Sequence, residues 1–290
     1  MMNAVVCGAV NVDYLAVPSG TFRYGDSNPG RLQMQVGGVG HNVAAALCAL
    51  GCRVQLAAAI GQDGAQAAIF SDAAEIGLDL TLSRVLPGQR CGTYLCINDE
   101  KGNVAAAVSD MEICEQLTPA FYKPMLPDIS LADVVLTEAN LPMETLLWLG
   151  EAVHRPLCAD CVSAEKAARL QPILSRLWLL KANAAEAERL TGTSDIPKAA
   201  QRLLAAGASQ VLISLGAKGC YYLSRAESGF LPIVPGEVVN TNGCGDAFLA
   251  GAAKALFEGQ TLREAAASAL RVAAQNAAYA GTIAKGLSLI

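Results

Sequence analysis

The chain has 290 residues, of which 53% are apolar and 16% charged, and its 21 basic and 26 acidic residues give a formal net charge of −5. This length and apolar content suit one large α/β domain with an ample core. Without a basic field, nucleic acid and anionic membranes are excluded as main partners, although local positive charge can still serve an anionic ligand.

The ten cysteines are scattered, and most lie inside apolar runs, where free cysteine behaves as a small hydrophobe. No signal-like segment is present, and no apolar run approaches the ~20 residues of a membrane helix. A reduced, cytoplasmic protein is therefore expected. The "CADC" of residues 158–161 is interpreted as the end of a buried strand. A redox or zinc motif is disfavoured because no second CxxC exists and the only histidines are His41 and His154.

Short apolar runs alternate along the chain with alanine-rich segments of helical pattern. This alternation predicts a mostly parallel sheet with helices on both faces, in which ligands bind beyond the carboxyl ends of the strands. The expected strands are residues 4–10, 53–61, 132–140, 155–160, 177–183 and 210–216, and the expected helices are residues 40–51, 63–77, 143–154, 184–192 and 197–207.

Two regions, residues 14–36 and 91–110, interrupt this rhythm. The second has the pattern of a β-hairpin with "NDEKGN" (98–103) as its turn. Both predict short β segments that project from the core and form a lid over the strand ends, with plain surface loops as the alternative. The whole chain, residues 1–290, is expected to be a single domain with this lid inserted.

Polar residues and glycines follow the first apolar run. Asn11 and Asp13 can grip hydroxyl groups there, or they simply end the strand. Gly37 and Gly38 precede the next helical segment and permit close approach of a ligand, and Asn42 offers both a donor and an acceptor. This cluster lacks the GK[ST] of a P-loop, and no GxGxxG follows the first strand, which disfavours a Rossmann dehydrogenase.

The stretch "NGCGDAFLAG" (242–251) places a glycine turn at the start of an apolar helix. Unpaired N–H groups and the positive end of the helix dipole make such a turn an anion cradle. Asp246 lies in the first helical turn, where it can accept a proton from an incoming hydroxyl while the N–H groups hold a phosphoryl group. An ordinary helix cap is the alternative.

Taken in this order, the motifs resemble the ribokinase-like (PfkB) carbohydrate and nucleoside kinases over nearly the whole chain. The resemblance implies a three-layer α/β/α sandwich with a mostly parallel central sheet and a small β-sheet lid. It also implies ATP-dependent transfer to a sugar hydroxymethyl group and a homodimer paired through the lid. The strings that carry it are "GAVNVD" (8–13), "GGVGHNVAAALCALG" (37–51), "KANAAEAERLTG" (181–192), "SLGAKGCYYL" (214–223) and "NGCGDAFLAG".

The resemblance further implies roles for individual residues, with the metal Mg²⁺ held through water. The matched positions are Asp246 for the catalytic base; Gly243, Cys244 and Gly245 for the anion hole; Asp13, Gly38 and Asn42 for the sugar, beside Asn11 and Gly37; Asn183 and Glu186 for the phosphates and Mg²⁺; Ser214, Gly216, Lys218 and Gly219 for the nucleotide loop; and Asn276 beside adenine.

Two positions depart from the family's usual DTxGAGD string. Asn240 replaces the leading acid, which helps to form a monovalent-cation site in many members, and this argues against activation by K⁺. Cys244 replaces alanine and is small enough to leave the backbone cradle intact.

Three strings are similar to those of the pseudouridine kinases within this family: "YGDSNPG" (24–30), "GGVGHN" (37–42) and "SDMEI" (109–113). They imply transfer to the ribose 5′-hydroxyl of a C-linked nucleoside, with Asp26, Ser27 and Asn28 reading the edges of a uracil ring. A simple tight turn is the alternative for this stretch. Ribose, fructose, adenosine and inosine stay open as acceptors. The presence of Asp246 disfavours a non-catalytic sugar- or nucleotide-binding regulator.

Both histidines and two methionines have alternative interpretations. His41 contacts the substrate, or else it caps its helix or faces solvent, whereas His154 is expected at the surface. Met34 and Met111 line a base pocket or belong to the core of the lid.

Overall fold

The computed structural model describes residues 1–99 and 104–290. Its strands are β1 (Asn3–Cys7), β2 (Asn11–Pro18), β3 (Gly30–Gly37), β4 (Arg53–Ala57), β5 (Ala59–Gly61), β6 (Arg84–Leu86), β7 (Gly92–Asn98), β8 (Val104–Asp110), β9 (Val134–Glu138), β10 (Leu157–Asp160), β11 (Leu179–Asn183), β12 (Gln210–Ser214), β13 (Cys220–Ser224) and β14 (Ser228–Leu231). Its helices are α1 (Val39–Ala49), α2 (Gln66–Ile76), α3 (Pro119–Tyr122), α4 (Leu126–Ile129), α5 (Met143–Ala152), α6 (Ala164–Ala167), α7 (Ala184–Thr191), α8 (Ile196–Ala205), α9 (Cys244–Phe257) and α10 (Leu262–Ala277).

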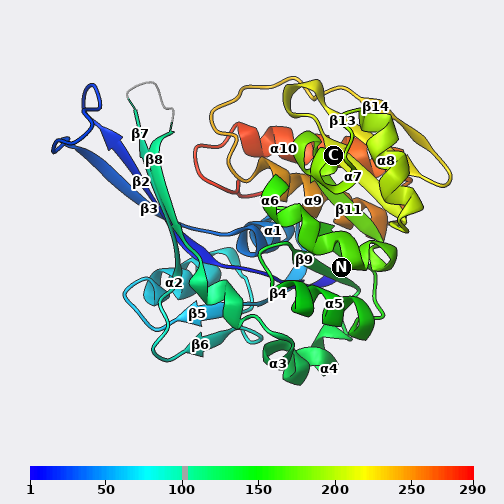
Figure 1. Ribbon diagram of the computed structural model, residues 1–290, viewed down its shortest axis with the longest axis horizontal. Coiled ribbons are helices and arrows are strands. Elements are labelled where there is room, and N and C mark those ends of the chain that lie inside the picture. The colour runs from blue at the N-terminus through cyan, green and yellow to red at the C-terminus, as the bar shows by residue number, and fades with distance from the viewer. Residues whose placement is uncertain (100–103) are drawn as a thin grey trace.

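An eight-stranded sheet in the order β14-β13-β12-β11-β10-β9-β1-β4 forms the centre of the molecule. Neighbouring strands from β12 to β4 run parallel, and β13 and β14 add an antiparallel edge. Both faces are buried: side chains of β1 alternate between two apolar clusters, one shared with α1, α9 and α10 and the other with α5, α7 and α8. The predicted three-layer α/β/α sandwich is therefore confirmed (Figure 1).

The observed elements lie close to the predicted ones. The run 53–61 divides at Ala58 into β4, which belongs to the central sheet, and β5, which pairs with β6 in a sheet of two strands. All ten cysteines are free, and Cys158 and Cys161 are buried at the end of β10 as expected for the "CADC" stretch. None of the described helices is long and apolar enough to cross a membrane.

A separate four-stranded sheet, in the order β3-β2-β7-β8, projects from the core as the two irregular regions predicted (Figure 1). Strands β7 and β8 pair antiparallel, which confirms the hairpin. Residues 100–103 of its expected "NDEKGN" turn lie outside the described residues.

The two faces of this small sheet differ in chemistry. In-register residues of neighbouring strands share a face. One face carries the polar row Gln35, Asp13, Tyr94 and Ser109 across the four strands. The other face carries the apolar row Met34, Tyr14, Leu95 and Val108.

The start of α1 packs directly on the end of β1, and two glycines make this contact possible. A Cβ built on Gly40 would lie 2.7 Å from the carbonyl carbon of Gly8, closer than real Cβ atoms approach. The His41 N–H also donates to the Ala9 carbonyl at 3.0 Å. This close approach fixes where α1 begins, and with it the position of Asn42.

The Gly40→Ala substitution tests this packing. Alanine has the higher helix propensity, so local preference alone favours the variant. We expect the backbone clash to prevail and to lower the free energy of unfolding by about 1–3 kcal/mol in denaturant titrations. Gly64→Ala is the matched control, because a Cβ there meets nothing within 4 Å. Equal stability of the two variants would contradict the role given to Gly40.

Candidate active site

Asp246 lies in the first turn of α9, directly after the glycine turn. Gly243 takes a left-handed conformation with φ of 71° at the helix N-cap, and a Cβ there would collide with the Thr282 carbonyl oxygen. The N–H groups of a first helical turn have no partner within the helix and can bind an anion, although the Cys244 N–H here also donates to the Thr241 carbonyl at 3.3 Å. The structure thus has the shape of the predicted anion cradle, with a carboxylate beside it.

A hydrogen bond joins this carboxylate to the other glycine cluster. Asn42 Nδ2, on α1, donates to Asp246 Oδ2 at 2.8 Å, and both side chains are buried. Burial raises the pKa of Asp246 to about 7, and the Asp160 carboxylate adds to the rise. A carboxyl group with this pKa can take up and release a proton near neutral pH.

Charged residues follow one another across the carboxyl edge of the central sheet. Glu138, Asp160 and Lys181 end or nearly end β9, β10 and β11 and lie in register with one another. Lys181 Nζ lies 2.9 Å from Asp160 Oδ2, and it would lie 3.1 Å from a Cβ on Gly245. A buried ammonium group is therefore held directly beside the glycine turn.

The polar cluster holds more carboxylates than cations. Asp160, Glu186 and Asp246 surround the Lys181 ammonium group, and Glu138 lies beside Asp160 and Asp246. Burial works to lower the pKa of Lys181, but the Asp160 and Glu186 carboxylates outweigh it and raise the pKa. Burial raises the pKa of Glu138 to about 7, although the N–H groups of Ala9 and Asn140 donate to it at 2.8 and 2.6 Å. This excess of acid suits a site that receives a cation or a proton.

The backbone after Asp160 is strained. The Val162 N–H donates to Asp160 Oδ1 at 2.6 Å, and Val162 has a φ of 64°. A β-branched residue in this region is uncommon, and such strain is concentrated at functional sites.

Asp13 lies near the start of β2, beside Asn11 and Gly37. The Asn11 side-chain amide donates to one of its carboxylate oxygens, and a Cβ on Gly37 would collide with the other. Gly38 has a φ of 96°, and a Cβ there would lie 2.7 Å from Asn11 Oδ1. Both glycines therefore leave room for the pair Asn11 and Asp13, whereas their predicted close approach to a ligand stays a prediction. Burial raises the pKa of Asp13, and the bond from Asn11 opposes the rise.

The loop predicted to hold the nucleotide forms a tight turn. Ser214 ends β12, and Gly216, with a φ of 57°, opens a turn that Gly219 closes with a φ of 95°. Lys218 is exposed in this turn, where its ammonium group is free to meet phosphate. Contact with a nucleotide remains a prediction for all four residues.

Asn183 and Glu186 form a capping box at the start of α7. The Glu186 N–H donates to Asn183 Oδ1 at 2.9 Å, and Glu186 Oε2 accepts from the Asn183 N–H at 2.7 Å. Among the described residues there is no cluster of three or more His, Cys, Asp or Glu side chains that could hold a metal. Magnesium usually keeps several waters and uses one or two carboxylates plus substrate phosphates, and Glu186 fits that pattern.

Asn276 does not lie on a surface that adenine could reach, so the structure does not support this expectation. It is completely buried, and its Nδ2 donates to the Thr282 and Asn242 carbonyls at 2.9 and 3.1 Å. Its Oδ1 accepts from the Ala284 N–H at 2.8 Å. Asn276 therefore holds the glycine turn and the C-terminal segment together.

Asn240 joins the glycine turn to the C-terminal segment through its amide group. Its Nδ2 donates to the Gly281 and Ala280 carbonyls at 3.1 and 3.2 Å, and its Oδ1 accepts from the Asn242 N–H at 2.9 Å. The neutral amide thus stabilises carbonyl groups of the C-terminal segment without an ion. Cys244 is half-buried, and burial raises the pKa of its thiol, which agrees with a passive role.

Several expectations about the substrate need correction. His41 neither caps α1 nor faces solvent: it is buried, and its Nε2 lies 2.7 Å from Asp72 Oδ2. Asp26 and its turn lie at the exposed tip of the small sheet, far from α9 (Figure 1), where Asn28 Oδ1 accepts from the Arg23 N–H at 2.8 Å. This location supports the tight-turn alternative.

The remaining residues with open interpretations are also placed. Met34 is exposed and so does not belong to the core of the small sheet, whereas Met111 is half-buried beside Gly92. His154 is exposed as expected.

Sequence reasoning missed Glu138, Asp160 and Lys181. Each is the charged residue at the end of an otherwise apolar strand, in "ADVVLTEAN", "RPLCAD" and "LWLLKAN". A charge in such a run rarely becomes buried without a partner. Because the carboxyl ends of parallel strands meet at one edge, these charges could have been predicted to cluster there.

Comparisons with known proteins agree with this geometry. Residues 1–288 match the model of the pfkB family carbohydrate kinases. The pseudouridine kinase of Escherichia coli K12 is 31% identical over 90% of this chain and 85% of its own length. A carbohydrate kinase structure from Agrobacterium tumefaciens matches with a TM-score of 0.88 and 31% identity over 100% of this chain and 95% of that chain.

The ribokinase of Arabidopsis thaliana, solved with ribose and ATP, shares the fold with a TM-score of 0.86 at 23% identity, over 99% of this chain and 97% of that one. The family match over nearly the whole chain and the kinase relatives point the same way as the buried carboxylate at the glycine turn. The chain belongs to the pfkB family of carbohydrate kinases and is an ATP-dependent phosphotransferase that acts on a sugar hydroxyl.

Proposed function

We propose that this kinase, acting as one domain with an inserted lid, transfers the γ-phosphoryl group of ATP to the ribose 5′-hydroxyl of pseudouridine. The observation that carries the proposal is the buried Asp246 carboxylate, bonded to Asn42 at 2.8 Å beside the glycine turn. Similarity to the E. coli pseudouridine kinase and the strings "GGVGHN" (37–42) and "SDMEI" (109–113) support the choice of acceptor.

In this reaction Asp246 takes the proton of the 5′-hydroxyl as the oxygen forms its bond to the γ-phosphorus and ADP leaves. The N–H groups of Gly243, Cys244 and Gly245 stabilise the charge on the phosphoryl oxygens. Lys181 adds positive charge directly beside this turn. Asp13 and Asn42 hold the sugar hydroxyls, so that the reacting atoms are aligned.

The nucleotide lies between the turn at Ser214–Gly219 and the glycine turn. Bound Mg²⁺ would offset the charge of the phosphates and of the acidic cluster, with Glu186 and Asn183 orienting its water ligands. The excess of buried carboxylates over the single Lys181 ammonium is the feature that fits a divalent cation. The ten free cysteines agree with a reducing, cytoplasmic setting.

Ribose is the second candidate acceptor. The exposed turn at Asp26 removes one sequence argument for contact with a base. The ribokinase of Bacillus subtilis is 27% identical over 94% of this chain and 92% of its own length.

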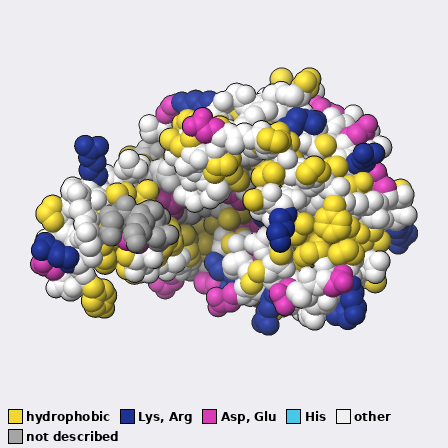
Figure 2. Space-filling view, turned by 90° about the horizontal axis from the view of Figure 1, so that it is seen from above, with side chains coloured by type: hydrophobic (Ala, Val, Ile, Leu, Met, Phe, Trp, Pro, Cys, Tyr) yellow, Lys and Arg dark blue, Asp and Glu magenta, His cyan; other side chains and the backbone are white. Residues whose placement is uncertain are grey.

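A homodimer paired through the small sheet is part of the proposal. Met34 and Val108, in the apolar row opposite Asp13, are 52% and 66% exposed. In Figure 2 the small sheet forms a lobe beside the larger body, with apolar side chains on its surface. A second copy of the same row would cover this face and remove it from water.

The base assignment predicts both a variant and a pH profile. Asp246→Asn should lower kcat by about 100- to 10,000-fold while nucleotide binding is retained. Because Asp246 must be ionised to accept a proton and its pKa is about 7, the single-turnover rate of the unmodified enzyme should rise with pH through that value. Asp195→Asn, at the exposed N-cap of α8, is the control and should behave like the unmodified enzyme. A flat profile across neutral pH would refute the assignment.

The acceptor is tested by ATP consumption with pseudouridine, uridine, adenosine, inosine, ribose and fructose. We expect the highest kcat/KM for pseudouridine, and Asp13→Ala should reduce it by weakening the hold on the sugar. Each assay is run in sodium and in potassium buffer. Because the Asn240 amide, in place of the family's usual acid, bonds the Ala280 and Gly281 carbonyls, we expect equal phosphorylation rates in the two buffers. A clear preference for another acceptor would displace the proposed substrate.

The dimer is tested by sedimentation velocity. Val108→Glu places a charge in the apolar row and should convert dimers to monomers without loss of folding. Gln33→Glu is the matched control, since Gln33 pairs with Leu15 and lies on the opposite face. A monomeric unmodified protein at micromolar concentration would rule the arrangement out.

A further inference from the structure

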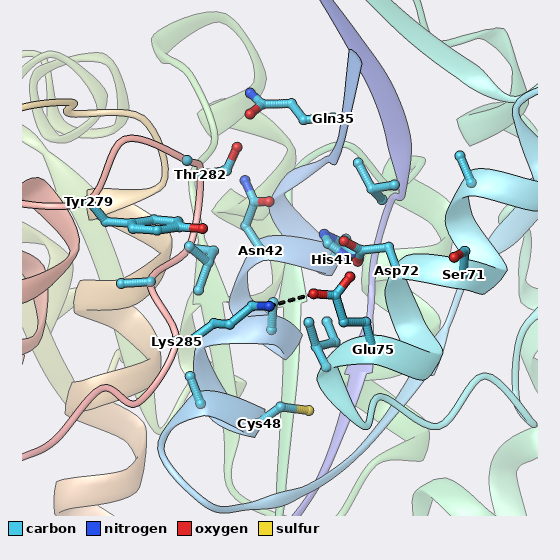
Figure 3. A pocket seen from close by; sticks show the side chains of 18 of the residues that line it. Gln35, His41, Asn42, Cys48, Ser71, Asp72, Glu75, Tyr279, Thr282 and Lys285 are labelled. Atoms are coloured by element: carbon cyan, nitrogen blue, oxygen red, sulfur yellow. Dashed lines mark hydrogen bonds and ion pairs between the residues drawn. The ribbon is translucent and has the colours of Figure 1, made fainter. Parts of the chain in front are cut away.

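A cavity of about 710 Å³ lies between α1, α2 and the C-terminal segment 279–286. Figure 3 looks into it: His41 and Asn42 come from α1, Asp72 and Glu75 from α2, and Tyr279 from the C-terminal segment. The volume is in the range of pockets that bind small molecules. The mechanism above uses only Asn42 from this lining.

Polar atoms without partners are concentrated in this cavity. In the described part of the chain, four buried side-chain polar atoms have neither a hydrogen-bond partner nor an ion-pair partner. Three of them, His41 Nδ1, Asn42 Oδ1 and Thr282 Oγ1, belong to residues that line the cavity. The His41 and Asn42 side chains belong to residues only 5% and 8% exposed. Buried polar groups are nearly always satisfied, so this grouping indicates a missing ligand.

The unpartnered atoms include acceptors. His41 Nε2 lies 2.7 Å from Asp72 Oδ2, so a ring hydrogen on Nε2 satisfies this bond, and in that tautomer Nδ1 offers a lone pair. Asn42 Nδ2 donates to Asp246, which leaves Oδ1 as an acceptor. The half-exposed Asp72 carboxylate adds acceptor capacity on the same wall.

The charges of the lining select against anions. Lys285, the cation of the lining besides any protonated His41, pairs with Glu75 across the cavity (Figure 3). Asp72 adds a further negative charge. A phosphate group would meet these carboxylates without a free cation to balance it. The cavity therefore suits an uncharged molecule that brings N–H or O–H donors.

The cavity borders the proposed acceptor site. Asn42, which bonds to Asp246, lines both. Gln35 also lines the cavity and lies in register with Asp13 on the neighbouring strand; with Met34 and Val36, which line it too, it makes β3, an edge strand of the small sheet, one wall of the cavity. A molecule whose sugar is held by Asp13 and Asn42 can extend its other end into the cavity.

We infer that this cavity receives the base of the acceptor nucleoside and that Asp72, His41 and Asn42 read its ring N–H donors. The inference rests on the proposed function. A uracil ring joined to ribose through carbon has two ring N–H groups, whereas the N-linked ring of uridine has one and presents C–H at the other position. An acceptor at that position discriminates the two nucleosides, because a polar group without its partner is costly.

The test is Asp72→Asn, whose amide oxygen keeps the bond to His41 while its NH₂ group replaces an acceptor. Values of kcat/KM are measured for pseudouridine, 1-methylpseudouridine, uridine and ribose. The unmodified enzyme should prefer pseudouridine to 1-methylpseudouridine and to uridine by about 10- to 100-fold. The variant should lose this preference and keep its activity on ribose. Ser71→Ala, on the same wall of α2, is the control and should retain the preference.

Two outcomes overturn the inference. A preference that survives Asp72→Asn removes Asp72 from recognition of the base. An equal loss for ribose and pseudouridine means that Asp72 acts by positioning α1, not by reading a ring.

Binding of free thymine, measured by calorimetry, separates this inference from the proposed function. Thymine carries both ring N–H groups and a substituent at the carbon that bears the sugar in pseudouridine, and 1-methylthymine lacks one of the N–H groups. Binding of thymine that depends on Asp72, in an enzyme that does not phosphorylate pseudouridine, supports the cavity and refutes the substrate. Absence of both thymine binding and pseudouridine phosphorylation refutes both.

Discussion

The hydrogen bond from Asn42 to Asp246 joins the two helices on which the site is built. It holds only because α1 begins directly against β1, where Gly8 and Gly40 allow backbone contact, and because Gly243 turns the chain into α9. Each of these glycines would clash if it carried a Cβ. Backbone packing therefore determines the distance between Asp246, the proposed base, and Asn42, which is proposed to hold the sugar.

The acidic cluster behind this bond is costly for folding and useful for catalysis. Removing four carboxylates and one ammonium from water carries a desolvation penalty that a single ion pair does not repay. The same burial raises the pKa of Asp246 to about 7, which suits a general base at neutral pH. A better-balanced set of charges would stabilise the fold but return Asp246 to the low pKa of an ordinary carboxylate.

The sequence predicted what depends on local pattern. Apolar runs and helical periodicity were sufficient for the layered fold, and the glycines at residues 37–38 and 243–245 mark, as expected, the starts of α1 and α9. Contacts between distant segments could not be predicted this way. His41 on α1 contacts Asp72 on α2, and the Asn276 side-chain amide donates to the Thr282 carbonyl. Neither contact can be inferred from the residues next to His41 or Asn276 in the sequence. The position of Asp26 could not be predicted from its motif either, because the β2–β3 hairpin places that turn at the far end of the small sheet.

The small sheet connects substrate binding to assembly through its two faces. Asp13 and Gln35 lie on the polar face, while Met34 and Val108 lie on the apolar one, and side chains alternate strictly between faces in each strand. A shift of one residue in the pairing of β2 and β3 would send Asp13 to the apolar face and expose apolar groups to the sugar. A partner that covers the apolar face would therefore stabilise the same register that places Asp13 on the face proposed to meet the substrate. In that arrangement assembly and sugar binding favour one conformation of the sheet, because both act on the same strand pairing.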